Sequence, residues 1–164
     1  MFQKKICMLG AFGVGKTSLV RRFVDTLFAD SYLTTVGVKL DKKTVTVRNE
    51  TVNLILWDIA GEDAASTVRT TYLRGSAGYL LVADSTRPVT LQVTRSIQSR
   101  AEAEIGKVPF ILLLNKCDLV NEWAIADSEI DALTALGWTI RRTSARTGES
   151  VEAVFQDIAE LTVR

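Results

Sequence analysis

A glycine-rich segment near the start of the chain has the residue types that bind phosphate. Residues 10–17 read GAFGVGKT and match the pattern GxxxxGK[ST]. Glycines reach the positive φ angles at which successive N–H groups converge on an anion, and the start of a following helix adds positive potential. Lys16 is expected to bridge the β- and γ-phosphates, and Thr17 to give its hydroxyl to Mg²⁺. The segment predicts a triphosphate-binding loop, with an ordinary glycine turn as the alternative.

A second candidate segment ends a predicted strand. Residues 57–61 read WDIAG, which places Asp58 at the carboxyl end of the strand, where open α/β sheets bind ligands. Asp58 can hold a water on Mg²⁺, and the N–H of Gly61 can meet a terminal phosphate. Because the pattern DxxG is common, a simple turn is the competing interpretation when this segment is taken alone.

A third segment indicates which base is bound. Residues 115–118 read NKCD and directly follow the apolar run 110–114. Guanine presents N1–H and N2–H₂ as paired donors that the carboxylate of Asp118 can accept together, whereas adenine has no such pair. Asn115 is expected to brace the neighbouring loops, and the aliphatic stem of Lys116 to cover the base. The segment therefore predicts a guanine nucleotide, with a plain turn as the alternative.

The composition excludes several other chemistries. The chain has 20 Lys and Arg against 19 Asp and Glu, and a net charge of +1 gives no reason to expect nucleic acid as a partner. It has no histidine, which excludes histidine-ligated zinc and Ser-His catalysis. Cys7 and Cys117 lack CxxC spacing, which favours reduced, buried thiols and a cytoplasmic location. No apolar run approaches the ~20 residues of a membrane span. We therefore expect no membrane anchor in this chain, and peripheral membrane association only through a C-terminal tail outside it.

Apolar runs typical of buried strands alternate with helical patterns, and no linker or repeat interrupts them. We therefore expect a single domain over residues 1–164, built on a doubly wound sheet. The predicted strands are 6–9, 39–47, 51–57, 79–83, 110–114 and, with a weaker pattern, 138–140. Only three residues separate the second and third of these strands, so they are expected to form an antiparallel hairpin at one edge.

Helical periodicity fills the intervals between these strands. The first helix is expected to follow the glycine-rich loop and to extend to Leu27. The second has Pro88 in its first turn and Ser85 or Thr86 as its N-cap, and the third is capped by Asp127. The apolar face of the last helix consists of Val151, Val154, Phe155, Ile158 and Leu161.

The order of GAFGVGKT, Thr35, WDIAG, NKCD and the tripeptide TSA at 143–145 resembles the small GTPases of the Ras superfamily over essentially the whole chain. The Rab-like branch is the most similar, because TVGV at 35–38, Trp57 and YLRGS at 72–76 are similar to Rab usage. The resemblance implies an α/β fold, the P-loop NTPase G domain, with a six-stranded, mostly parallel sheet, one antiparallel edge strand and helices on both faces. It also implies a signalling switch that binds GTP or GDP with Mg²⁺ and hydrolyses GTP.

The same resemblance assigns roles to individual residues. It implies that Thr35 closes onto Mg²⁺ and the γ-phosphate only in the GTP state, and that Phe28 packs beside the guanine. The backbone of Ser144 and Ala145 would meet the guanine carbonyl oxygen. From the residues alone, Thr35 is an unremarkable loop residue and Phe28 a core residue at a helix end. The implied catalytic residues are Lys16, Thr35, Gly61 and Glu62, and the implied metal ligands are Thr17, Thr35 and Asp58. The implied nucleotide-binding residues are Gly13, Val14, Gly15, Lys16, Thr17, Ser18, Phe28, Asp30, Thr35, Asp58, Gly61, Asn115, Lys116, Asp118, Ser144, Ala145 and Arg146.

Partner surfaces are also implied by the resemblance. An exchange factor, a GTPase-activating protein and effectors would bind through residues 28–40 and 61–76. An ATP-dependent kinase, which also uses a phosphate loop, would need a lid rich in basic residues and a second-substrate site, and the sequence indicates neither.

The sequence departs from the family pattern at Glu62, where the family usually has a glutamine that orients the attacking water. An ionised carboxylate accepts hydrogen bonds but cannot donate them, and near the γ-phosphate it would repel the developing charge. We therefore expect slow intrinsic hydrolysis that needs a partner. The alternative is that Glu62 and Asp63 form a solvated, catalytically idle start to a helix.

Phe12 is the second departure, because the best-known relatives have glycine at this position in the loop. A bulky side chain on the γ-phosphate side would exclude an arginine finger supplied by a partner or shield the phosphate from water. Harmless packing against the segment 61–76 is the alternative. Together, Phe12 and Glu62 leave open a second function, a GTP-binding interaction module with negligible hydrolysis.

Overall fold

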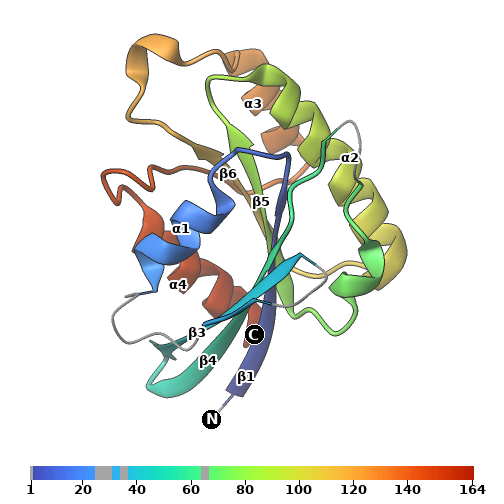
Figure 1. Ribbon diagram of the computed structural model, residues 1–164, viewed down its shortest axis with the longest axis vertical. Helices are drawn as coiled ribbons and strands as arrows, with labels where there is room; N and C mark the ends of the chain where they lie inside the picture. Colours follow the sequence, from blue (N-terminus) through green and yellow to red (C-terminus); the bar gives the residue numbers. More distant parts are fainter. Residues whose placement is uncertain (1, 25–30, 34–36, 64–66) are drawn as a thin grey trace.

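A mostly parallel β-sheet forms the middle layer of the molecule, with helices on both of its faces (Figure 1). This computed structural model describes residues 2–24, 31–33, 37–63 and 67–164. Within these residues the sheet has seven strands in the order β2-β3-β4-β1-β5-β6-β7. The strands are β1 (Phe2–Gly10), β2 (Ser31–Leu33), β3 (Val38–Val47), β4 (Glu50–Ile59), β5 (Gly78–Asp84), β6 (Phe110–Asn115) and β7 (Ile140–Arg142).

The hairpin of β3 and β4 is the antiparallel part of the sheet that the sequence predicts. Its turn residues Arg48 and Asn49 have φ angles of 50° and 66°, the left-handed conformation that a two-residue hairpin loop requires. From β4 through β1, β5 and β6 to β7, all pairs are parallel. The expected six-stranded α/β sheet is therefore confirmed, and the three-residue β2 extends it by pairing antiparallel with β3.

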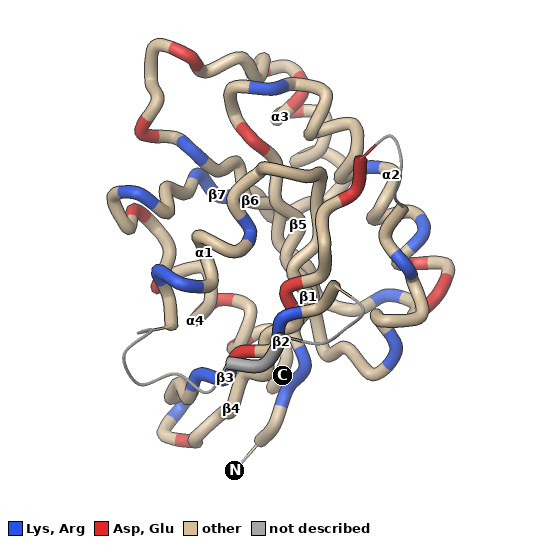
Figure 2. The backbone as a smooth tube through the Cα atoms, in the orientation of Figure 1, with Lys and Arg blue, Asp and Glu red and all other residues tan. Residues whose placement is uncertain are grey.

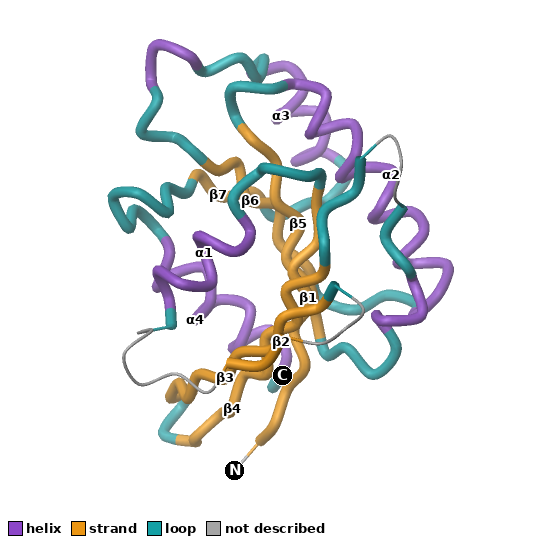
Figure 3. The backbone as a smooth tube through the Cα atoms, viewed as in Figure 1, coloured by secondary structure: helices purple, strands orange, loops and turns teal. Residues whose placement is uncertain are grey.

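The helices cover the two faces of the sheet, as Figure 3 shows in purple against the orange strands. They are α1 (Lys16–Phe23), α2 (Pro88–Ile105), α3 (Asp127–Ala135) and α4 (Val151–Thr162), with short 3₁₀ turns η1 (Thr70–Leu73) and η2 (Val120–Glu122). Successive side chains of β1 point to opposite faces. Ile6 and Met8 therefore join the core under α1 and α4, whereas Cys7 and Leu9 join the core under α2 and α3.

Several expected element boundaries are wrong, among them the start of β1, which lies at Phe2, four residues earlier than expected. The N-cap of α2 is Arg87, because the backbone N–H and the hydroxyl of Thr86 are both engaged by the carboxylate of Asp84. Ala126 is the N-cap of α3, so Asp127 is its first helical residue. The last strand begins at Ile140, two residues later than expected.

The residue behind that last error is Trp138, whose ring packs edge-on against Phe110 with centroids 5.1 Å apart. Its apolar side chain is typical of a strand, yet Trp138 is a half-buried residue of the loop before β7 that packs against the core under α2 and α3. At the first helix, α1 ends at Phe23, and the expected extension to Leu27 lies outside the described residues.

Both cysteines are free, as expected, but only Cys7 is buried. Cys117 is half-buried because it lies in a loop, where its thiol donates to Oε2 of Glu149 at 3.1 Å. Among the described residues, none of the helices has the length and apolar character needed to cross a membrane. Basic and acidic positions are spread over most elements of the chain in Figure 2.

Candidate functional site

The phosphate-loop sequence lies between the end of β1 at Gly10 and the start of α1 at Lys16, the strand-loop-helix context that its chemistry requires. Gly13 and Gly15 have φ angles of 77° and 99°, which glycine adopts without strain. A side chain at Gly15 would also collide with the amide of Asn115. The tight approach of the loop to the Asn115 segment therefore requires glycine.

Lys16, Thr17 and Asp58 come together at the base of this loop. The hydroxyl of Thr17 donates to Oδ2 of Asp58 at 2.5 Å, across the boundary between α1 and β4. Burial lowers the pKa of Lys16, and the nearby Asp58 offsets part of that effect. Burial raises the pKa of Asp58, while the Thr17 hydroxyl and the Lys16 ammonium oppose the rise. Mg²⁺ binds hard oxygen ligands such as hydroxyl and carboxylate oxygens. The contacting side chains of Thr17 and Asp58 supply both, so these two residues fit this ion.

A cavity of about 500 Å³ opens next to the loop. Its lining residues come from the phosphate loop, α1 and the loops after β6 and β7: Gly15, Ser18, Asn115, Lys116, Asp118, Leu119, Ala145 and Arg146. The sequence predicts all of them except Leu119, the apolar residue that directly follows the NKCD motif. The cavity therefore unites the segment predicted to bind phosphate with the segment predicted to bind guanine.

Asn115 connects two of the loops that line the cavity. Its Nδ2 donates to the carbonyl of Val14 at 2.9 Å, and its Oδ1 accepts from the hydroxyl of Thr143 at 3.1 Å. The side chain is 1% exposed, so both bonds are shielded from water. Asn115 thus fixes the spacing between the phosphate loop and the loop at 143–145.

Ser144 joins the loop at 144–149 to the NKCD segment at 115–118, the guanine-type motif. Its hydroxyl donates to Oδ1 of Asp118 at 2.7 Å. The same hydroxyl accepts from the backbone N–H of Thr147 at 3.1 Å. From α1, Arg22 donates to the carbonyls of Thr147 at 3.0 Å and Arg146 at 3.5 Å. The sequence gives no motif for Arg22, so its role in holding this loop could not be predicted.

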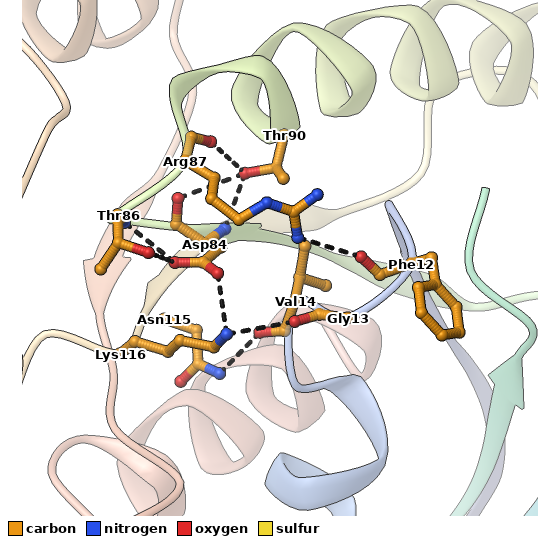
Figure 4. Close-up of polar contacts among 9 residues, drawn as sticks. All are labelled: Phe12, Gly13, Val14, Asp84, Thr86, Arg87, Thr90, Asn115 and Lys116. Atoms are coloured by element: carbon orange, nitrogen blue, oxygen red, sulfur yellow. Dashed lines mark hydrogen bonds and ion pairs between the residues drawn. The ribbon is translucent and has the colours of Figure 1, made fainter. Parts of the chain in front are cut away.

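Lys116 lies between the phosphate loop and β5 (Figure 4). Its Nζ is 2.8 Å from Oδ2 of Asp84 and 3.2 Å from the carbonyl of Gly13. The side chain of Asp84 is 1% exposed, and its Oδ1 accepts from the backbone and hydroxyl of Thr86. Burial by itself raises the pKa of Asp84, but the bonds from Lys116 and Thr86 outweigh it and leave the pKa below its usual value. The sequence motifs do not predict this role of Asp84, although the residue is an acid directly after the predicted strand 79–83.

Phe12 and Arg87 meet at the outer side of the phosphate loop. Arg87 Nη1 donates to the carbonyl of Phe12 at 3.2 Å, while the Phe12 ring points away from Lys116 and Asp84 (Figure 4). Phe12 is 68% exposed, so the alternative of harmless packing finds little support in the described residues of 61–76. It is the backbone of Phe12 that contacts this segment: its N–H donates to the carbonyl of Glu62 at 2.8 Å.

Glu62 is neither solvated nor at the start of a helix, which corrects the second expectation for this residue. Its side chain is 15% exposed, and Oε1 lies 2.6 Å from Nη2 of Arg100 on α2. Oε1 also accepts from the backbone N–H of Val68 at 3.1 Å. Within the described part of 61–76, the first helical turn is η1, which begins at Thr70. The carboxylate of Glu62 is therefore paired with Arg100 on α2.

Three predicted site residues, Phe28, Asp30 and Thr35, lie outside the described residues. The same holds for parts of the two expected partner surfaces, 28–30 and 34–36 in the first and 64–66 in the second. Their roles stay predictions.

The chain is similar to known proteins over most of its length. The family model described as "Ras family" matches residues 5–164. The chain is 34% identical to Ras-related protein Rab-1 of Theileria annulata over 95% of this chain and 72% of that protein. It is 35% identical to Ras-related protein RABE1e of Arabidopsis thaliana, over 95% and 73% of the two chains. For Ras-related protein SEC4 of Saccharomyces cerevisiae, identity is 34% over 96% and 74%.

The family model covers the phosphate loop and every lining residue of the cavity, and each of the three relatives is named a Ras-related protein, two of them with Rab names. The fold, the order of the motifs and the likeness over nearly the whole chain agree: this chain belongs to the Ras family and is a Rab-like small GTPase.

Proposed function

We propose that this chain, as a single domain, is a molecular switch that binds GTP or GDP with Mg²⁺ and hydrolyses GTP slowly without a partner. The observation that carries the proposal is the cavity that joins Gly15 of the phosphate loop to Asp118 of the guanine-type motif. Family membership supports GTPase activity in general.

Base selection rests on Asp118. Ser144 holds one of its oxygens at 2.7 Å, which orients the carboxylate. A carboxylate accepts the paired N1–H and N2–H₂ donors of guanine, and adenine leaves it without these partners. Lys116, anchored by Asp84, presents its aliphatic stem to the base plane. The pocket is therefore suited to a guanine nucleotide.

Phosphate binding rests on the loop and on Lys16, whose buried ammonium gains a strong partner when an anion enters. Thr17, Asp58 and Thr35 are the residues that would hold Mg²⁺. When bound, this ion neutralises charge on the β- and γ-phosphates. Thr35 and Gly61 would then respond to the presence of the third phosphate, so that residues 28–40 and 61–76 offer exchange factors, activating proteins and effectors a state-dependent surface.

Slow hydrolysis follows from Glu62. The residue cannot donate a hydrogen bond as a glutamine amide does, and Arg100 holds its carboxylate on α2. The attacking water therefore lacks an orienting group from this position. The same contact favours a second candidate function, an interaction module that binds GTP with negligible hydrolysis and signals through nucleotide occupancy.

Single-turnover hydrolysis of bound GTP separates these functions. We expect slow but measurable turnover in the wild type and a faster rate in Glu62→Gln. No turnover above the uncatalysed rate would favour the interaction module, and a wild type at least as fast as Glu62→Gln would contradict the handicap.

The role of Phe12 is tested with an activating protein. If the side chain excludes an arginine finger, Phe12→Gly raises the stimulated rate, whereas an unchanged rate contradicts the steric hypothesis. A cytoplasmic location, with peripheral membrane association through a tail, is proposed by analogy with the Rab relatives and is checked by fractionation.

A further inference from the structure

Glu62, Val68 and Arg100 form a closed set of contacts that the sequence does not reveal. Arg100 donates to Oε1 of Glu62 at 2.6 Å and to the carbonyl of Val68 at 3.4 Å. The backbone N–H of Val68 donates to the same Glu62 oxygen at 3.1 Å. Val68 is itself 6% exposed and belongs to the core under α2. Both ends of the segment 62–68 are therefore anchored to α2 through one arginine.

The backbone of Glu62 is bound at the same time to the phosphate loop. Its N–H donates to the carbonyl of Gly10 at 3.0 Å, and its carbonyl accepts from Phe12 at 2.8 Å. At Gly61, a Cβ would lie 2.6 Å from the Cα of Phe12, so the two segments are in direct backbone contact. The Glu62 side chain therefore extends from a backbone that contacts residues 10–12. The orientation of this side chain determines whether its negative charge lies toward the phosphate loop or away from it.

Arg100 decides that direction. The side chains of Glu62 and Arg100 are 15% and 31% exposed, so water screens their interaction less than at an open surface. With the arginine present, the carboxylate is paired and directed to α2. Without it, a partly buried negative charge would need another partner, and rotation toward the loop would place it near the terminal phosphate of a bound nucleotide.

We propose that Arg100 is a specificity-determining positioning residue, which holds the Glu62 carboxylate on α2 and thereby lets the phosphate loop accept a triphosphate as readily as a diphosphate. The inference rests on the proposed guanine-nucleotide site and goes beyond it. It assigns triphosphate tolerance to a residue outside the cavity. Its effect is selective, because a diphosphate lacks the terminal group that the freed carboxylate would repel.

The test compares dissociation rates of fluorescent GDP and a fluorescent, non-hydrolysable GTP analogue, measured by stopped flow with excess unlabelled nucleotide. In Arg100→Gln, we expect the ratio of analogue to GDP dissociation rates to rise roughly fivefold, the effect of two like charges about 8 Å apart at an intermediate dielectric. Arg100→Lys keeps the positive charge and should stay nearer the wild type. The double variant Arg100→Gln with Glu62→Gln should return to the wild-type ratio, because no carboxylate remains.

Arg141→Gln is the matched control, since it breaks a distant surface pair in which Arg141 and Asp157 are 3.6 Å apart. Its ratio should equal that of the wild type. A merely structural role for Arg100 predicts equal changes for both nucleotides and no recovery in the double variant, and either result overturns the proposal. If Arg100→Gln does not fold, the single variant Glu62→Gln gives a second measurement. A rise in its ratio of analogue to GDP dissociation rates would also overturn the proposal. A wild type that binds neither guanine nucleotide would instead refute the proposed function itself.

Discussion

Replacing Asp84 by asparagine tests how the loop after β5 supports the nucleotide pocket. The carboxylate is 1% exposed and accepts three hydrogen bonds, from Lys116 Nζ at 2.8 Å and from the Thr86 N–H and hydroxyl at 2.9 and 2.6 Å. Asparagine has the same shape but no charge and one acceptor oxygen. It can therefore serve Thr86 or Lys116, but not both.

The magnitude follows from the bond that is lost. A hydrogen bond to a charged group contributes ~1.5–3 kcal/mol, and the lower half of this range applies because the Lys116 side chain is 35% exposed. We expect Asp84→Asn to lower the free energy of unfolding by about 2 kcal/mol. Lys116 also contacts Gly13 of the phosphate loop, so GDP dissociation should accelerate by about tenfold, equivalent to ~1.4 kcal/mol.

Urea denaturation at a fixed excess of GDP gives the stability, because bound nucleotide itself shifts the unfolding equilibrium. Stopped-flow release of fluorescent GDP gives the dissociation rate. Asp157→Asn is the control: its pair with Arg141 is 3.6 Å long and exposed, so a change of at most ~0.5 kcal/mol is expected. If Asp84→Asn behaves like this control in both assays, Asp84 does not position Lys116.

Three further predictions concern the same pocket. Gly15→Ala should abolish tight nucleotide binding, because the added carbon collides with the Asn115 amide at a φ of 99°; wild-type affinity in a titration would contradict this. Arg22→Ala should speed GDP release severalfold, because the carbonyl of Thr147 loses its hydrogen bond, whereas Arg22→Lys should change the rate little. Equal stopped-flow rates for the wild type and both variants would rule out this role of Arg22. The pKa of Asp84 lies below its usual 3.8, so its contribution is complete above that pH and is lost as the pH falls through the folded-state value. The stability gap between the wild type and Asp84→Asn should therefore be constant from pH 5 to 7 and shrink below about pH 4, and a gap that widens there would contradict the sign.

The sequence predicts the parts of the site that lie in contiguous motifs. GAFGVGKT and NKCD place their chemistry within a few residues of a strand end, and parallel strands bring those ends to one edge of the sheet. The fold follows from the same periodicity, because buried strands and amphipathic helices differ in apolar spacing.

The residues that the sequence misses act across long separations. Arg22, Arg87 and Arg100 each lie on a helix or helix end with no motif, and their partners become neighbours only in the folded chain. The wrong N-cap of α2 has the same origin, because Asp84 captures Thr86 and leaves Arg87 at the cap. The strand β2 has three residues, too few for a periodic pattern to show.

The most direct test of the central claim is the base preference of the purified protein, measured by competition of GDP and ADP against a fluorescent guanine nucleotide in the presence of Mg²⁺. We expect GDP to bind at least ~100-fold more tightly than ADP, since adenine leaves the Asp118 carboxylate without its paired donors. Asp118→Asn should lose most of this preference. Equal affinity of the wild type for GDP and ADP would contradict the claim that this pocket selects guanine.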